Sequence, residues 1–140
     1  MAQLGTRLLK LEIDGAERSA EVSNARITTG AADSDFLTFA QAAAGGSRQY
    51  ALAFTAAQDL VADTLWDLIW TGAGTEVTGT FIPYGNEVPS ATQPHYDFIA
   101  VVTEPDGDLL GGEANVSTTA RMTVECVWQL TAKPTKVIAV

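Results

Sequence analysis

The sequence predicts a mainly β protein, an antiparallel β-sandwich or barrel of about six or seven strands with one flanking helix at about 57–71. Two observations lead to this prediction. Only 18% of the residues are charged, and the chain is rich in Thr, Val, Ala and Gly, which favours sheet over helix. Residues 120–130 also alternate between apolar and polar positions, the period of a half-buried antiparallel strand. The apolar positions are Ala120, Met122, Val124, Cys126, Trp128 and Leu130.

The first two strands are predicted on either side of a tight turn. Residues 9–13 alternate between apolar and charged side chains, and Asp14-Gly15 follows them. This pair tolerates the positive φ angles of a two-residue hairpin turn. A second extended stretch runs over 21–29. Its apolar alternation slips by one residue near Ser23, so we expect a β-bulge there.

Residues 30–48 match no regular element and are long for a loop inside a compact domain. The segment carries three large apolar residues, Phe36, Leu37 and Phe39. Exposed apolar patches are uncommon on monomers, so these side chains need a partner. Two interpretations stay open: they pack back onto their own domain, or they dock on a neighbouring subunit.

A third strand is predicted at 50–54, and a helical period follows it. The sequence from Thr55 to Gln58 matches a capping box, in which Thr55 caps the helix and Gln58 reaches back. Gly72 and Gly74 are expected to end the helix. The apolar stripe of this helix consists of Val61, Leu65, Leu68 and Ile69.

Three aspartates, Asp59, Asp63 and Asp67, are predicted on one face of that helix because they are spaced four residues apart. The face is either solvated or a subunit contact that receives Arg or Lys from a neighbour. A metal site without histidine is a third interpretation. Trp66 and Trp70 lie beside the apolar stripe, so we expect them to seal the helix against the sheet.

Three more strands are predicted, at 77–81, 96–102 and 120–130. Turn sequences that contain Pro and Gly separate them. The chain then ends in an apolar tail, which we expect to be paired with something because an exposed apolar terminus is unfavourable. The large apolar residues of this tail are Val137, Ile138 and Val140.

The charge balance argues against several partner classes. Eight basic and seventeen acidic residues give a net charge of −9, which repels phosphate backbones and anionic lipid. We therefore expect neither a nucleic-acid reader nor a membrane-docking protein. No apolar run approaches the ~18–20 residues of a membrane span. A channel through which nucleic acid passes without sticking remains compatible with this charge.

No catalytic or metal-binding motif is complete. His95, the only histidine, begins a predicted strand and has no evident catalytic partner. Cys126, the only cysteine, lies between apolar neighbours, where burial makes a thiol inert. The phosphate-loop spacing at 107–112 is followed by Glu113 where a lysine is required. A calcium loop from Asp106 fails at its later ligand positions. We expect no enzyme, no cofactor and no metal site.

Two stretches of the chain resemble a known family. The first comprises 64–75, with the sequence TLWDLIWTGAGT, together with 81–86 and 94–96. The second comprises 111–113, 117–121, Trp128 and 133–136, and includes the sequences GGE, STTAR and KPTK. In composition and order, over roughly the C-terminal two-thirds of the chain, they resemble the major tail tube proteins of long-tailed, non-contractile bacteriophages.

The resemblance implies a structural protein of the virion tail that is assembled in the host cytoplasm. Members of this family form hexameric rings whose strands line a continuous inner barrel. The rings stack around a tape-measure protein, tail-terminating and tip proteins close the tube, and double-stranded DNA later passes through it. For this chain, the resemblance implies one domain over 1–140, an inter-ring loop at 30–48, and terminal arms at 1–7 and 131–140.

Further hypotheses accompany this expectation. An acidic, weakly hydrogen-bonding bore would let DNA slide, because phosphate contacts dominate nucleic-acid affinity. A second candidate is a different virion sandwich protein, such as a capsid decoration or neck protein. A third is a carbohydrate-binding or adhesin module that presents Tyr84, Tyr96 and the tryptophans to a sugar.

Overall fold

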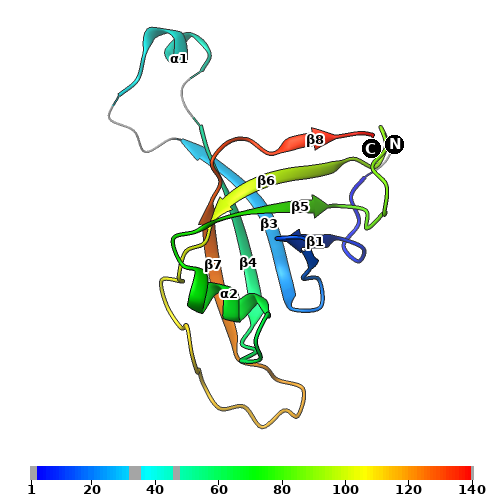
Figure 1. The fold of residues 1–140 in the computed structure, drawn as a ribbon, viewed down its shortest axis with the longest axis vertical. Helices are drawn as coiled ribbons and strands as arrows, with labels where there is room; N and C mark the ends of the chain where they lie inside the picture. Colours follow the sequence, from blue (N-terminus) through cyan, green and yellow to red (C-terminus); the bar gives the residue numbers. More distant parts are fainter. Residues whose placement is uncertain (1–2, 32–35, 46–47, 140) are drawn as a thin grey trace.

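The structure, a computed structural model, describes residues 3–31, 36–45 and 48–139 and is shown in Figure 1. In these ranges the chain forms eight strands in two antiparallel sheets, with two helices. The strands are β1 (Lys10–Ile13), β2 (Ala16–Glu17), β3 (Val22–Ala31), β4 (Arg48–Ala57), β5 (Glu76–Ile82), β6 (His95–Val101), β7 (Thr123–Gln129) and β8 (Thr135–Val137). The helices are α1 (Phe39–Ala43) and α2 (Leu65–Gly72).

The sheets pack as a sandwich and do not close into a barrel. The five-stranded sheet has the order β2-β1-β5-β6-β8, and the three-stranded sheet has the order β3-β4-β7. Both sheets contribute side chains to one buried core, so the predicted antiparallel sandwich is confirmed. At its centre, the rings of Phe54 and Trp128 meet edge to face with their centroids 4.8 Å apart, a favourable geometry for aromatic pairs.

The two sheets are joined at a corner where β7 ends. The amide of Leu130 donates to the Tyr50 carbonyl at 2.9 Å, and Leu130 also bridges to Ala100 of the other sheet. The amide of Thr131 then donates to the Ile99 carbonyl at 3.0 Å. Backbone hydrogen bonds therefore hold one side of the sandwich closed.

The predicted turn and bulge are both confirmed. Asp14 and Gly15 have φ angles of 54° and 80° and connect β1 directly to β2. The register of β3 against β4 shifts between Val22 and Asn24, next to the predicted slip at Ser23. The bulge lies at the start of β3, which then pairs with β4 along its whole length.

The apolar face predicted over 120–130 is correct only from Val124 onward. Four of its residues are buried, but Ala120 and Met122 are exposed. The reason is the length of the neighbouring strand. The last register pair of β4 with β7 is Ala57 with Thr123, so the chain before Thr123 has no sheet to pack on.

The helix α2 begins eight residues later than predicted, at Leu65. The predicted start was wrong because β4 continues through Ala57, and Thr55 is paired with Glu125 of β7. The actual N-cap is Thr64, whose Oγ1 accepts a hydrogen bond from the Asp67 amide at 3.3 Å.

A partly buried ion pair fixes the N-terminus of α2 against the turn between β2 and β3. The Leu65 amide donates to Glu21 Oε1 at 2.8 Å, so this carboxylate satisfies a free N–H of the first helical turn. Arg18 Nη1 donates to Glu21 Oε2 at 3.2 Å and to the Asp63 carbonyl at 2.7 Å. The helix is thereby held across one end of the sandwich, where it buries Leu65, Trp66 and Ile69.

We expect Glu21→Ala to lower the free energy of unfolding by about 1–3 kcal/mol, the usual cost of leaving a partly buried charged group and an amide unpaired. Urea denaturation followed by circular dichroism measures this change. Glu17→Ala is the matched control, since Glu17 is exposed and should change stability by less than about 0.5 kcal/mol. Equal losses for the two variants would contradict a structural role for the Glu21 carboxylate.

Candidate functional site

The most prominent surface feature is the β3–β4 hairpin, whose connecting segment projects away from the sandwich (Figure 1). Its last register pair is Ala31 with Arg48, so the two strands enter the segment predicted as the irregular loop 30–48. The described part of the connection, residues 36–45, is called the tip below. A capping box begins α1 there: Thr38 Oγ1 accepts from the Gln41 amide at 3.1 Å, and Gln41 Oε1 accepts from the Thr38 amide at 2.9 Å.

The apolar residues of the tip face solvent. Phe39 is 97% exposed, Phe36 and Leu37 are also exposed, and α1 buries no residue. The exposure of Leu37 and Phe39 contradicts the interpretation in which these two side chains pack back onto their own domain. A tip that presents large apolar side chains to water gains free energy when another surface covers it, at roughly 25 cal/mol per Å². Docking on a neighbouring subunit stays a prediction.

The three aspartates do not share a helix face, so that prediction was wrong. Only Asp67 lies in α2, because the helix starts at Leu65. Asp63 has a positive φ of 66°, and its amide donates to Asp67 Oδ2 at 3.2 Å. Asp59 Oδ1 accepts from the Val61 amide at 3.2 Å. These carboxylates shape the turn that leads into the helix.

The two tryptophans of α2 have different environments. Trp66 is buried, as predicted, and its Nε1 donates to the Leu109 carbonyl at 2.8 Å. Trp70 stacks on Trp66 with centroids 5.4 Å apart but is 53% exposed, so the expectation that it seals the helix was wrong. The predicted stripe residue Val61 is also exposed, since it precedes the helix.

Gln58 ties three segments of the chain together by hydrogen bonds. The Gln58 side chain donates to the Gly111 and Thr123 carbonyls at 2.9 and 3.0 Å and accepts from the Gly111 amide at 2.7 Å. The Gln58 amide donates to the Met122 carbonyl at 2.9 Å. We call the exposed apolar residues that lie within three positions of these bonded residues in the sequence the Gln58 surface: Leu60, Val61, Leu110 and Met122.

The C-terminal tail belongs in part to its own sheet. Val137 lies in β8, pairs with His95 of β6 and is half-buried. Ile138 follows β8 and is exposed, and Val140 lies outside the described residues. The predicted arm 131–140 is therefore partly an edge strand, because its backbone finds a partner in the same chain. Of the predicted arm 1–7, residues 3–7 are exposed and form no helix or strand.

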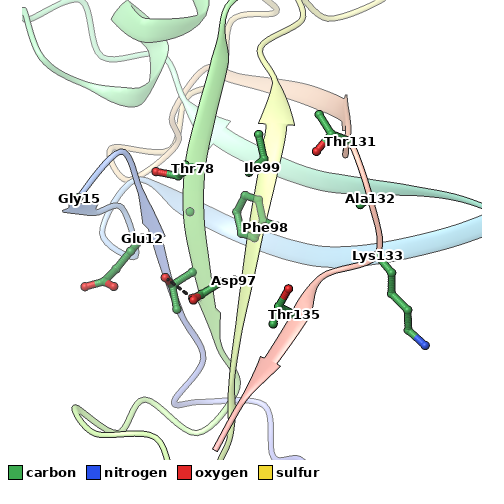
Figure 2. Close-up of a pocket in the computed structure, with 12 residues that line it drawn as sticks. Glu12, Gly15, Thr78, Asp97, Phe98, Ile99, Thr131, Ala132, Lys133 and Thr135 are labelled. Atoms are coloured by element: carbon green, nitrogen blue, oxygen red, sulfur yellow. Dashed lines mark hydrogen bonds between the residues drawn. The ribbon is translucent and has the colours of Figure 1, made fainter. Parts of the chain in front are cut away.

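A shallow groove of about 460 Å³ crosses the outer face of the five-stranded sheet (Figure 2). Thr80 Oγ1 donates to Asp97 Oδ1 there at 2.9 Å, while the Lys133 side chain points away from the sheet. His95 is buried outside this groove, with Nε2 2.9 Å from the Asn86 carbonyl oxygen. In the described ranges, no group of three or more acidic, His or Cys side chains is placed to hold a metal ion. The same ranges contain no helix that is long and apolar enough to cross a membrane.

The fold and these surfaces define the class of protein as an antiparallel β-sandwich with a projecting apolar hairpin. Comparison with known proteins gives it no family: no protein-family model and no curated protein matches the sequence. Its function has to be argued from the surfaces themselves.

Cys126 is buried between the sheets, and this burial raises the pKa of its thiol to about 12. At neutral pH the group therefore stays protonated and acts as a small apolar core residue. Because the folded pKa lies above the unfolded one, the thiol's contribution to stability falls as pH rises above the unfolded pKa.

We expect Cys126 in the native protein at pH 8 to react with a disulfide reagent at least ~100-fold more slowly than in the unfolded chain, because both thiolate and access are lacking. Absorbance of the released thiolate follows the reaction, with and without concentrated urea. Leu110→Cys is the positive control, since Leu110 is exposed and its replacement should react fast in the native state. Rapid native labelling of Cys126 would contradict the core assignment.

Proposed function

We propose that this protein is a non-enzymatic structural subunit that self-assembles, and that its assembly is the tube of a bacteriophage tail. The observation that carries the proposal is the tip: Phe39 is 97% exposed at the end of a hairpin whose strands are each ten residues long. Such a hairpin presents an apolar surface at a distance from its own core. Covering this apolar surface with a neighbouring copy would remove it from water, which favours association.

The edges of the two sheets support lateral assembly through the three-stranded sheet. The five-stranded sheet ends in β2 and β8, which are only two and three residues long, and short edge strands resist pairing. The three-stranded sheet ends in β3 and β7, of ten and seven residues. The unpaired backbone groups of a long edge strand can hydrogen-bond to a strand of another copy. In a closed ring of copies, every such edge would be paired.

In the proposed tube, the outer face of the three-stranded sheet could line the inner channel. Because Leu52, Phe54 and Ala56 of β4 point into the core, the alternate residues of β4 and their register partners face outward. Three of these cross-strand rows are Asn24–Thr55–Glu125, Arg26–Ala53–Val127 and Thr28–Ala51–Gln129. Arg26 is the only cation in these three rows and Glu125 is the only anion; the other residues are uncharged.

The hollow over Arg26 and Glu125 is also lined by Glu104, Asp106 and Asp108, so in the proposed tube this face gives the bore more acidic than basic side chains. DNA would pass without sticking, because non-specific affinity comes from Lys and Arg contacts to phosphate, and Arg26 is the one cation in these three rows. The tape-measure protein, the tail-terminating and tip proteins, and the DNA itself are the further partners that the family resemblance implies.

The alternative functions are less well supported. A capsid decoration or neck protein would also need exposed contacts between subunits, and the shape of the assembled particle distinguishes it from a tube. A carbohydrate-binding module needs a platform of several exposed aromatic rings. Trp70 is exposed, but Trp66 and Trp128 are buried, and Tyr84 and Tyr96 are partly buried.

We expect the concentrated protein to form rings or tubes, and Phe39→Asp to lower its association constant at least ~10-fold, because a charge replaces an apolar side chain that becomes covered. Sedimentation velocity measures the assembly state, and negative-stain microscopy shows the particle shape.

Val88→Asp is the matched control, since Val88 is 61% exposed in a loop remote in sequence from the tip. It should assemble like the unchanged protein. A strictly monomeric wild-type protein at high concentration would contradict the proposed function.

A further inference from the structure

The edge of β7 that faces away from β4 has a neighbouring segment. The long connection between β6 and β7 begins with residues 103–108, called the strap below, and Figure 1 shows this connection (yellow) on the side of β7 away from β4. The strap and the outer face of β7 line the same hollow, which has a volume of about 610 Å³. The strap therefore borders the long edge through which the three-stranded sheet would pair with another copy.

The strap runs alongside β7 in the opposite direction. It begins at Trp128, near the end of β7, where Trp128 Nε1 donates to the Thr103 carbonyl at 3.1 Å. It ends at Asp108, which lines two hollows together with Thr123, the first residue of β7. Both segments take five steps along the chain, from 103 to 108 and from 128 to 123. The strap thus occupies the place of a further antiparallel strand beside β7.

The strap covers this edge without pairing to it. In the described part of the chain, residues 104–108 neither donate nor accept a hydrogen bond. Pro105 has no N–H to donate, and Gly107 in the middle of the strap weakens any strand. Like charges on neighbouring strands are also unfavourable. The hollow gathers four carboxylates around the single cation Arg26: Glu104, Asp106, Asp108 and Glu125.

An edge that is covered but unpaired keeps backbone donors and acceptors for an incoming strand. Such a strand would form hydrogen bonds that the strap does not form, which favours its replacement of the strap. Little holds the middle of the strap in place. Its anchors are at its ends, the bond from Trp128 to Thr103 and the bond from Trp66 Nε1 to the Leu109 carbonyl at 2.8 Å.

We propose that the strap controls lateral assembly: it covers the edge of β7 in the free subunit and moves away when β3 of a neighbouring copy pairs there. β3 is the other long edge of the same sheet, and its Arg26 would bring a cation to the acidic edge. Because β3 and β7 are both antiparallel to β4, the pair between copies in a ring would be parallel. This inference rests on the proposed function and adds a conformational step to it.

A disulfide that joins the strap to β7 tests this step. In the variant Asp106→Cys/Glu125→Cys, both substitutions line the same hollow, and native Cys126 is buried. We expect oxidation to lower the association constant at least ~10-fold, because apparent affinity falls with the fraction of subunits whose edge is open. Sedimentation velocity measures the association. Reduction of the same sample should restore it, and Glu125→Cys alone should assemble equally before and after oxidation.

A second variant needs no disulfide. Pro105→Val/Asp106→Thr supplies an N–H, removes one like charge and adds two residues that favour strands, so the strap should pair with β7. Hydrogen exchange should then become slower at the amides of 123–129, and the association constant should again fall at least ~10-fold. Pro89→Val/Glu87→Thr is the matched control, because it makes the same kinds of change in the connection between β5 and β6 and should leave assembly unchanged.

The outcomes separate the two proposals. Wild-type protein that stays monomeric at high concentration overturns the proposed function and, with it, the role of the strap. Wild-type protein that assembles, together with an oxidised variant that assembles as well as its reduced form, overturns the strap alone. Failure of the introduced cysteines to join within the monomer contradicts the placement of the strap on the edge. Normal assembly of Pro105→Val/Asp106→Thr with slowed exchange at 123–129 also overturns the proposed step.

Discussion

The carboxylate of Glu21 holds the N-terminus of α2 in place against the sandwich, and the surface at that end of the molecule depends on this contact. One oxygen accepts from the Leu65 amide and the other from Arg18, so the helix is fixed at Leu65 and lies across the end of the sandwich. The residues before it become a turn that leaves Leu60 and Val61 in water. A stabilising contact inside the domain thus also creates the apolar surface at its end.

The division between buried and exposed apolar residues follows from the lengths of the strands. Between the sheets, alternate residues of paired strands fill one core in which Trp128 is fully buried. Where a strand has no paired neighbour, its apolar side chains are exposed to water. Met122 lies beyond the last pair of β4 with β7, and the tip lies beyond the last pair of β3 with β4. Several of the exposed apolar residues therefore lie where strand pairing stops, and covering them requires another surface.

The features predicted correctly from the sequence are those that depend on residues close together in the chain. The alternation of β7, the Asp14-Gly15 turn and the bulge near Ser23 are local signals, and all three were confirmed. The start of α2 was missed because the apparent capping box at Thr55 competes with pairing to Glu125, seventy residues away, and the pairing wins. The Glu21–Leu65 bond and the docking of β8 on β6 are also contacts between distant segments. By contrast, the capping box of Thr38 and Gln41 is a local signal with the same spacing as Thr55 and Gln58, so the short helix α1 could have been predicted from the sequence.

Lateral and axial growth of the proposed tube would use different chemistry. The edges of β3 and β7 offer backbone donors and acceptors, whose pairing depends little on the side chains present. The tip offers apolar side chains, whose burial depends on shape and area and only weakly on salt. Changes to side chains at the tip should therefore affect stacking while rings still close. For a subunit that carries −9, contacts through backbone edges and through the uncharged residues 36–45 of the tip would keep the repulsion between copies low.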